Sequence, residues 1–329
     1  MNYKKSEAKE AARAQFRGVW AAIATPFHAD GTLDEAGLRR NMRHFTGGLG
    51  VAGIFCAGTM GEFWALTKEE RKRVVEIVVE EARGKCKVIA HTGHHSPDET
   101  VDLTRHAQEV GADFAVVINP YYPVSGEQAI YEWFRAVVSK VDIGVWMFDT
   151  PFSGLGLSAQ LTARIADFEN VCGIKVSRPL PHYAEVKKLC GGKIVLSHPS
   201  ETEYLTLMRD HGMRVHMSSA APFLMQTALW KPMHEYSELG LAGRFDEAQK
   251  VRDSFAPLRE VHEKWMREPW LKHQIIPIAY LKAWTEMLGL AAGPVRAPLL
   301  QITDEERATL RADLESCGLL ARVSAIRAA

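Results

Sequence analysis

One lysine of this chain lies inside an apolar run, because Lys175 falls within VCGIKVS. Burial disfavours the charged form of an ammonium group and therefore lowers its pKa. A neutral amine is a nucleophile toward carbonyl carbons, so Lys175 is a candidate for Schiff-base chemistry. The alternative is an ordinary lysine that extends to solvent or pairs with a carboxylate such as Glu62 or Glu201.

The loop GTMGE at 58–62 has the composition of a ligand-binding loop. Gly58 and Gly61 allow the backbone to approach a ligand closely, because glycine has no Cβ. The hydroxyl of Thr59 and nearby N–H groups, including that of Met60, can hold a carboxylate. Loops of this composition are common, so this one indicates a site only together with other residues.

Three further side chains could transfer protons. They are the phenol of Tyr122, the carboxylate of Asp149 and the imidazole of His198, whose usual pKa lies near neutrality. Each also has a structural explanation, which is packing for Tyr122, a turn for Asp149 and an exposed loop for His198. The run HTGHH at 91–95 offers imidazole ligands, but no carboxylate follows it closely, and we expect no metal site.

A regular alternation of elements would position these groups. Short apolar runs alternate with amphipathic stretches of about 12–16 residues, which predicts repeated strand–helix units. The predicted strands are 19–24, 53–57, 87–91, 114–119, 143–148, 171–176, 193–197 and 214–218. Eight such units are typical of an α/β fold, the (β/α)₈ TIM barrel, whose active site lies at the carboxyl ends of the strands.

The pattern changes after residue 232, where only helical periods remain, at 234–240, 244–265, 274–288 and 303–316. We therefore predict a charged N-terminal extension over 1–16, a barrel over 17–232 and a C-terminal helical extension over 233–329. The structural rival is a doubly wound sheet, which usually begins with a glycine-rich phosphate loop. ATPFHADGTLD, after the first predicted strand, is not such a loop.

Composition narrows the class of partner. Lys plus Arg and Asp plus Glu each number 40, so the net charge is zero, which argues against nucleic acid and anionic membranes as partners. The five cysteines are scattered, form no CxxC pair and suit a reducing cytoplasm. The first residues lack the apolar core of a secretory signal, and no apolar run reaches the ~18 residues of a membrane helix. We expect a cytoplasmic protein that acts on a small molecule.

Taken together, the motifs resemble those of the dihydrodipicolinate synthase / N-acetylneuraminate lyase family of class I aldolases. TPF at 25–27, GTMGE at 58–62, NPYYP at 119–123 and GIK at 173–175 have the order and spacing of that family. WALTKEER and GLAAGPVRAPL also fit, so the resemblance covers roughly 16–315.

This resemblance implies a (β/α)₈ barrel with C-terminal helices that forms a homo-oligomer, a dimer or tetramer, and uses no cofactor. It implies a Schiff base between Lys175 and a 2-oxo acid such as pyruvate. Thr59 and the loop around it would bind the substrate carboxylate. Tyr122 matches a tyrosine that joins a proton relay and often comes from a neighbouring subunit.

Several positions depart from the family pattern. Phe148 stands where the family usually has a tyrosine that passes protons to and from the substrate, and Met60 replaces a second hydroxyl residue. FSGL at 152–155 lacks the arginine with which the synthase proper binds its second substrate. SHPS at 197–200 replaces the usual glycine and aspartates. We therefore do not expect a true dihydrodipicolinate synthase.

We predict a lyase that acts on a 2-oxo acid, either by aldol cleavage or condensation with pyruvate or by dehydration of a 2-oxo-3-deoxy sugar acid. The alternative is a catalytically altered member that binds a 2-oxo acid as a sensor. The predicted catalytic residues are Lys175, Tyr122 and Thr59, and the predicted substrate-binding residues are Gly58, Met60, Gly61, Phe148, Asp149, His198, Ser200 and Ser218.

The sequence leaves two possibilities for the group that is joined to the 2-oxo acid in the substrate. Phe63, Trp64, Phe148 and Phe152 near the predicted mouth would suit an aromatic aldehyde. Ser200, Glu201, Ser218 and Ser219 would suit sugar hydroxyls. Of the two, the sequence slightly favours the polyhydroxy substrate.

Overall fold

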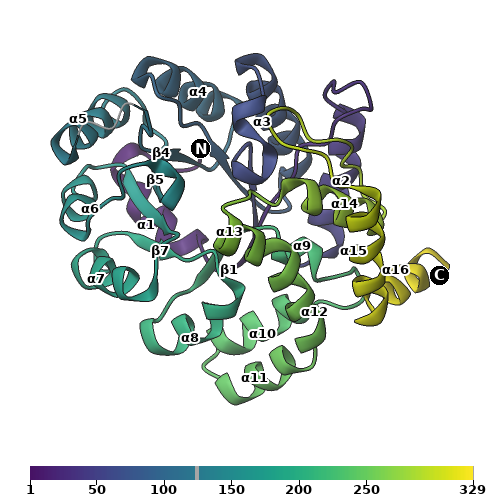
Figure 1. Ribbon diagram of the computed structural model, residues 1–329. Coiled ribbons are helices and arrows are strands. Elements are labelled where there is room, and N and C mark those ends of the chain that lie inside the picture. Colours follow the sequence, from purple (N-terminus) through teal and green to yellow (C-terminus); the bar gives the residue numbers. More distant parts are fainter. Residues whose placement is uncertain (123–125, 329) are drawn as a thin grey trace.

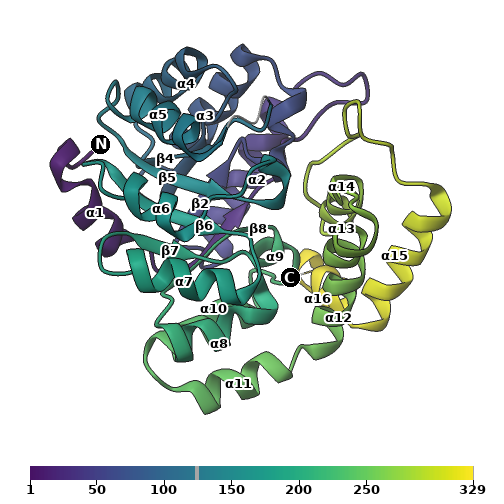
Figure 2. The same cartoon turned by 60° about the vertical axis from the view of Figure 1, so that its left-hand side comes forward.

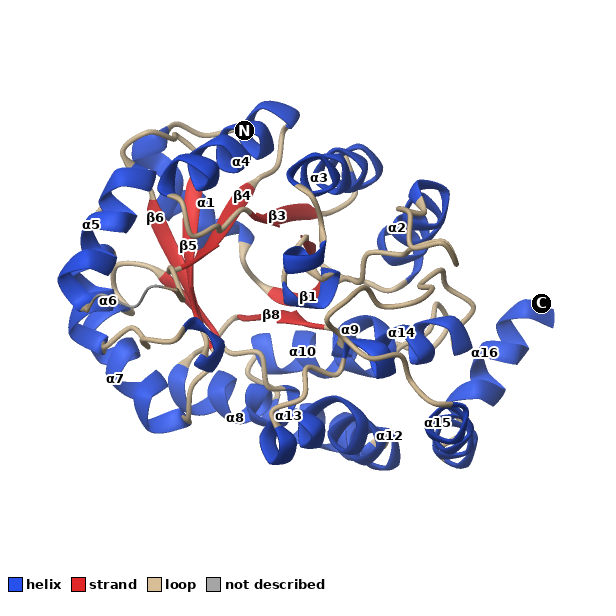
Figure 3. Cartoon of the chain, turned by 45° about the horizontal axis from the view of Figure 1, so that its top comes forward, coloured by secondary structure: helices blue, strands red, loops and turns tan. Residues whose placement is uncertain are grey.

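The computed structural model describes residues 1–122 and 126–328, apart from the side chains of Phe152, Ser218 and residues 326–328. Within these ranges, eight parallel strands are neighbours in the order β7-β6-β5-β4-β3-β2-β1-β8 and form a nearly closed barrel (Figure 3). The strands are β1 (Gly18–Ala22), β2 (Gly53–Cys56), β3 (Lys87–His91), β4 (Phe114–Ile118), β5 (Gly144–Asp149), β6 (Val171–Val176), β7 (Val195–Ser197) and β8 (Val215–Ser219). The predicted TIM barrel is confirmed, with strand ends shifted by no more than two residues.

Helices surround the barrel on its outer face (Figure 1). They are α2 (Glu35–Gly48), α3 (Lys68–Ala82), α4 (Pro97–Val110), α5 (Glu127–Val138), α6 (Ala159–Ile165), α7 (Leu180–Cys190), α8 (Glu201–His211) and α10 (Pro232–Leu241), and short α9 (Ala221–Leu224) precedes α10. Because helices cover one face of each strand and side chains fill the other, the strands read as apolar runs and not as alternating ones. Thr67 begins α3 with a capping box that includes Glu70.

The barrel is closed between β7 and β8 by the Ser197 hydroxyl. Its Oγ donates to the carbonyl of Val215 at 3.2 Å and accepts from the N–H of Met217 at 2.9 Å. Ser197 is fully buried, so these two bonds satisfy backbone groups that would otherwise lack a partner at this seam.

The N-terminal segment packs against the amino ends of the strands. Helix α1 (Ala8–Gln15) lies on the side of the barrel away from the C-terminal helices (Figure 2). Phe16, directly after α1, lies with its ring 4.2 Å from those of Trp20 and Trp146. This charged segment also has an apolar face, which consists of the buried residues Ala8, Ala12 and Phe16. That face fills the barrel interior at the amino ends of the strands.

The C-terminal region consists of α11 (Phe245–Asp253), α12 (Ala256–His262), a π-helical turn (Glu263–Arg267), α13 (Glu268–His273), α14 (Ile278–Met287), α15 (Asp304–Ser316) and α16 (Leu319–Ala328). The single helix predicted over 244–265 is wrong, because the chain breaks before Pro257, whose nitrogen carries no hydrogen to donate. The start predicted at 274 is also wrong, since Gln274 has a φ of +55° and ends α13. Among the helices of the described ranges, none is long and apolar enough to span a membrane.

A buried ion pair joins the barrel to these helices. Lys282 on α14 lies with its Nζ 2.6 Å from Glu62 Oε1, and both side chains are almost fully buried. The other Glu62 oxygen accepts the N–H of Arg296 at 2.9 Å. Nζ of Lys282 also donates to the carbonyl of Pro294 and lies 3.9 Å from the ring centre of Phe27. The loops after β1 and β2 are thereby fixed to α14 and the segment that follows it.

We expect Glu62→Gln to lower the free energy of unfolding by about 3–5 kcal/mol, because the substitution leaves the Lys282 ammonium buried without its counter-charge. Urea denaturation followed by circular dichroism measures this loss. Glu238→Gln is the control, because it removes an exposed pair with Arg17 at 3.1 Å and should cost no more than about 1 kcal/mol. Equal losses in the two variants would contradict the anchoring role of the buried pair.

Candidate active site

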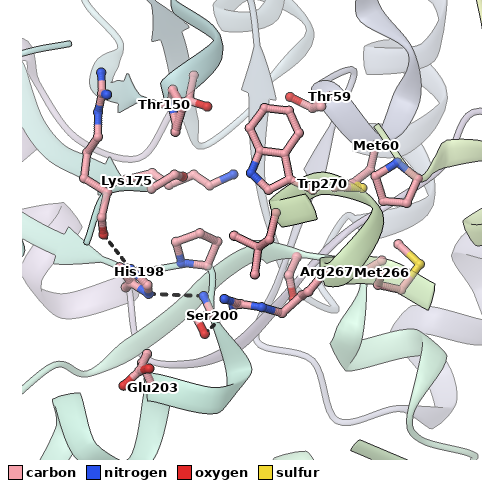
Figure 4. A pocket seen from close by; sticks show the side chains of 18 of the residues that line it. Thr59, Met60, Thr150, Lys175, His198, Ser200, Glu203, Met266, Arg267 and Trp270 are labelled. Carbon is pink, nitrogen blue, oxygen red and sulfur yellow. Dashed lines mark hydrogen bonds between the residues drawn. The ribbon is translucent and has the colours of Figure 1, made fainter. Parts of the chain in front are cut away.

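A cavity of about 430 Å³ opens at the carboxyl ends of the strands, between the barrel and the C-terminal helices (Figure 4). Its barrel side includes Thr59, Met60, Phe148, Thr150, Lys175, Ser177, Arg178, His198, Ser200 and Ser219. Its helical side includes His262, Met266, Arg267, Trp270, Leu271, Ile276 and Pro277. The cavity therefore lies where active sites of this fold occur.

Lys175 points from β6 into this cavity (Figure 4). The residue is only 5% exposed, and its Nζ lies 4.0 Å from the ring centre of Phe148 and 5.7 Å from that of Phe55. Burial lowers the pKa of the Lys175 amine to about 7. A substantial fraction of the amine is therefore uncharged near neutral pH.

The carboxylates considered as partners of Lys175 are bound elsewhere. Glu62 pairs with Lys282. Glu201 accepts from Arg259 at 2.8 Å and from the hydroxyl of Tyr236 at 3.1 Å. The alternative prediction, that Lys175 pairs with Glu62 or Glu201, is thus wrong. The amine faces the cavity instead.

The loop after β2 has a geometry that only glycine permits at its start. A Cβ at Gly58 would lie 2.6 Å from the ring of Phe55. Ala57 and Glu62, on either side, have φ values of +53° and +55°, which cost energy in residues other than glycine. The N–H groups of Thr59 and Met60 open a short 3₁₀ turn, where helix geometry provides no acceptor within the turn.

Both Thr59 and Met60 line the same cavity as Lys175. Buried Gly61 keeps the loop in place, because its carbonyl accepts from the hydroxyl of Thr25 at 2.9 Å. The loop can therefore present a hydroxyl and backbone N–H groups to a bound carboxylate.

Phe148 and Asp149 point to opposite sides of β5, as side chains alternate along a strand. Phe148 lines the cavity, whereas Asp149 is fully buried outside the lining. Asp149 accepts from the Leu157 N–H at 3.2 Å and from Arg178 Nε at 3.1 Å. Its second oxygen lies 3.2 Å from His182 Nε2. The structure does not bring Asp149 to the cavity, and its contacts give it a role in holding Arg178.

His198 lines the cavity with both ring nitrogens hydrogen bonded. Nδ1 accepts from the Ser200 N–H at 3.2 Å, so Nε2 is the protonated nitrogen and donates to the carbonyl of Arg178 at 3.1 Å. Burial lowers the pKa of His198 to about 4. The neutral ring therefore fixes the loop, and a proton transfer would break one of these bonds. The Ser200 hydroxyl in turn accepts from Arg267.

Besides Asp149, the predicted residues Tyr122, Gly58 and Gly61 are not among those that line the cavity. The side chain of Tyr122 is 79% exposed and does not line it. The side chain of Ser218 lies outside the described part of the structure. Tyr121 is half-buried and packs on His95 with ring centres 3.9 Å apart.

Sequence reasoning missed the residues that the C-terminal helices contribute. Met266, Arg267 and Trp270 reach the cavity from the π-helical turn and α13 (Figure 4). The one feature of the sequence that could have indicated this contribution is the tryptophan in REPWLKH, an aromatic residue in a charged segment. Nothing in the sequence states that this segment lies over the mouth of the barrel.

The histidine-rich run after β3 has other contacts. Nδ1 of buried His91 lies 3.4 Å from Arg71 Nη2, and Nδ1 of His94 accepts from the Ser96 N–H. Burial holds the pKa of His91 well below its usual value. Over residues 1–122 and 126–328, no group of three His, Cys, Asp or Glu side chains is arranged to hold a metal ion.

Comparisons with known proteins agree with this arrangement. The model of the dihydrodipicolinate synthetase family matches residues 15–317. The chain is 36% identical over 301 residues to a 4-hydroxy-tetrahydrodipicolinate synthase of Methanothrix thermoacetophila, covering 90% of this chain and 95% of that protein. It is 33% identical over 314 residues to an uncharacterized DapA-like lyase of Halobacterium salinarum, covering 92% and 94%.

Solved structures give the same result. Dihydrodipicolinate synthase from Aquifex aeolicus shares 30% identity with a TM-score of 0.80, covering 92% of this chain and 99% of that one. The chloride-inhibited dihydrodipicolinate synthase from Acinetobacter baumannii, complexed with pyruvate, shares 25% identity with a TM-score of 0.80, covering 93% and 99%.

We expect Lys175→Met to reveal the lowered pKa as a dependence of stability on pH. The folded state of the native protein releases its Lys175 proton above about pH 7, whereas the unfolded chain holds it to about pH 10. Stability of the native protein relative to Lys175→Met should therefore rise between about pH 7 and pH 9, by roughly 2 kcal/mol. Urea denaturation at both pH values measures this difference.

Lys188→Met is the control, because Lys188 is exposed on α7 and its replacement should leave no such pH dependence. If the difference in stability between the native protein and Lys175→Met did not change with pH, the buried amine would keep an ordinary pKa.

Proposed function

This chain belongs to the dihydrodipicolinate synthetase family of lyases, and we propose that Lys175 binds a 2-oxo acid such as pyruvate as an imine. The observation that carries the proposal is the buried Lys175 amine, with its pKa of about 7, inside a cavity at the barrel mouth. The similar protein of known structure from Acinetobacter baumannii is complexed with pyruvate, which supports this class of substrate.

In the proposed reaction, the neutral Lys175 amine attacks C2 of the 2-oxo acid, and loss of water gives a protonated imine. This cation accepts electrons from the adjacent bonds. Cleavage of the C3–C4 bond, with loss of the C4 hydroxyl proton, releases an aldehyde and leaves an enamine. Protonation at C3 and hydrolysis then give pyruvate and free Lys175. In the alternative path, the imine loses a C3 proton to give an enamine, which expels the C4 hydroxyl as water once that oxygen takes up a proton. Hydrolysis of the resulting unsaturated imine releases the dehydrated 2-oxo acid and free Lys175.

The loop after β2 is proposed to bind the substrate carboxylate. The Thr59 hydroxyl and the N–H groups of Thr59 and Met60 are hydrogen-bond donors at the cavity wall. Glycine at position 58 permits this close approach of backbone to ligand. Gly61 supports the loop through its bond with Thr25.

Phe148 supports an aldolase or dehydratase over a true dihydrodipicolinate synthase. Its ring packs on Lys175 and has no group that can donate or accept a proton. Asp149 and His198 are held by their own hydrogen bonds, which disfavours either side chain as a replacement for the missing phenol. The reaction is therefore proposed to draw its protons from Tyr122 or from the substrate and water.

We propose that Tyr122 acts in a homo-oligomer, a dimer or tetramer, in which it enters the cavity of a neighbouring subunit. The exposure of its ring supports this, because a tyrosine that is 79% exposed is available to a partner surface. Such an arrangement would place a phenol near the imine without any rearrangement of the chain that carries Lys175.

Borohydride reduction in the presence of pyruvate is expected to add one covalent adduct at Lys175, located by peptide mass spectrometry. The initial rate should rise with pH and level off above about pH 7, being roughly a hundredfold lower at pH 5, because only the neutral amine attacks. Lys175→Arg should give no adduct, and Lys188→Arg should behave as the native protein. Absence of an adduct with a panel of 2-oxo acids would overturn the proposal.

Tyr122→Phe is expected to lower kcat for pyruvate release from 2-oxo-3-deoxy acids by roughly 10²-fold or more, since a positioned proton donor contributes about that much. Trapping of pyruvate at Lys175 should continue, and sedimentation should show the same oligomer. An unchanged kcat would remove Tyr122 from the mechanism. Trapping by the native protein with no turnover of any compound would favour the sensory alternative.

A further inference from the structure

We propose that the cavity beyond Lys175 is a subsite for an apolar, planar partner group, such as the ring of an aromatic aldehyde, held against Trp270. This inference rests on the proposed imine at Lys175. It adds the chemical class of the compound that is joined to the 2-oxo acid or released from it.

The C-terminal helices give the cavity an apolar wall opposite the lysine. Trp270 of α13 and Lys175 point toward one another across the cavity (Figure 4). Met266 lines the same side, and Leu271 and Ile276 continue the wall. Thioether and indole groups bind apolar and aromatic surfaces favourably, and among these side chains only the indole N–H of Trp270 can donate a hydrogen bond.

The barrel side of the cavity presents a second aromatic surface. Phe148 lines the cavity and already packs on the Lys175 amine, and Met60 lies on the same side. A group attached at C4 of an imine on Lys175 would therefore extend between Phe148 and the wall that contains Trp270. A flat ring fits such a space, because both of its faces then contact apolar side chains.

Ser200, Glu201 and Ser219, which the sequence offered for sugar hydroxyls, are already hydrogen bonded within the protein, whereas the buried Ser177 hydroxyl at the cavity has no partner among the described residues. Ser200 Oγ accepts from Arg267, and Glu201 is held by Arg259 and Tyr236. Ser219 Oγ lies 3.1 Å from His216 Nε2 and accepts from the Ala221 N–H. Among the described side chains, the set that favoured a polyhydroxy substrate in the sequence is thus committed to structural bonds.

Each of the two arginines at the cavity is paired with a carboxylate, but the buried Nη2 of Arg178 has no partner among the described residues. Arg178 pairs with Asp149 at 3.1 Å, and Arg267 lies 3.1 Å from Glu263. Against Met266, Leu271 and Ile276, the hydroxyl groups of a polyhydroxy substrate would exchange bonds to water for contacts with apolar side chains, which is unfavourable. A substrate with an apolar ring would lose no hydrogen bonds on entry.

The volume of the cavity fits this reading. About 430 Å³ lies within the ~300–1,000 Å³ range of small-molecule sites. Pyruvate alone would leave most of this volume empty, so the remaining space belongs to the group beyond C3.

The test compares pyruvate release from two 4-hydroxy-2-oxo acids, one with a phenyl group at C4 and one with a polyhydroxy chain, coupled to lactate dehydrogenase. The native protein should show a kcat/KM at least tenfold higher for the phenyl compound. Trp270→Ala should lower that value by about tenfold, equivalent to about 1.4 kcal/mol, and leave the polyhydroxy value nearly unchanged. Trp270→Phe should retain most of the preference.

Trp230→Ala is the matched control, because Trp230 is a half-buried indole outside the cavity that contacts Phe255 and Arg322. It should leave the ratio of the two kcat/KM values unchanged. A preference for the polyhydroxy compound, or an unchanged ratio in Trp270→Ala, would overturn the inference while pyruvate is still trapped at Lys175. Loss of trapping in the native protein would overturn the imine itself, so the two failures are distinguishable.

Discussion

The unfavourable desolvation of one ammonium group is the interaction on which the site depends. Strand β6 places Lys175 between aromatic rings of β2 and β5, where water has little access. The charged amine is therefore disfavoured and its pKa falls to about 7. The reactivity proposed for Lys175 is thus a property of its position in the barrel, and a change that admitted water to this point would raise the pKa again.

The loop after β2 links this chemistry to the rest of the fold. Thr59 and Met60 face the cavity, and Glu62, at the end of the same loop, turns away to pair with Lys282. The left-handed conformation of Glu62 makes this reversal possible within a few residues. The C-terminal helices that carry Met266 and Trp270 are therefore anchored to the loop proposed to hold the substrate carboxylate. The proposed carboxylate site and the proposed partner subsite are thus both supported by the ion pair between Glu62 and Lys282.

How much of the site could be predicted varies with the residue. Lys175 and the loop from Gly58 to Gly61 could be identified because their signals are local: an amine in an apolar run, and glycines in a tight loop. Asp149 was placed at the cavity by its position at a strand end, but side chains alternate and its neighbour Phe148 faces the cavity instead. His198 is joined by two hydrogen bonds to Arg178 and Ser200. These contacts could not be predicted from the spacing of the residues in the sequence.

The sequence by itself determined the order of the eight barrel strands, the family resemblance and the presence of a lysine inside an apolar strand. These depend on hydrophobic periodicity and on short motifs, which act over a few residues. Only the tertiary structure decided that Trp270 faces Lys175 and that the serines and Glu201 are bound to other residues. The bond between Glu201 and Arg259 joins positions 58 residues apart, and packing in three dimensions, not local preference, selects such contacts.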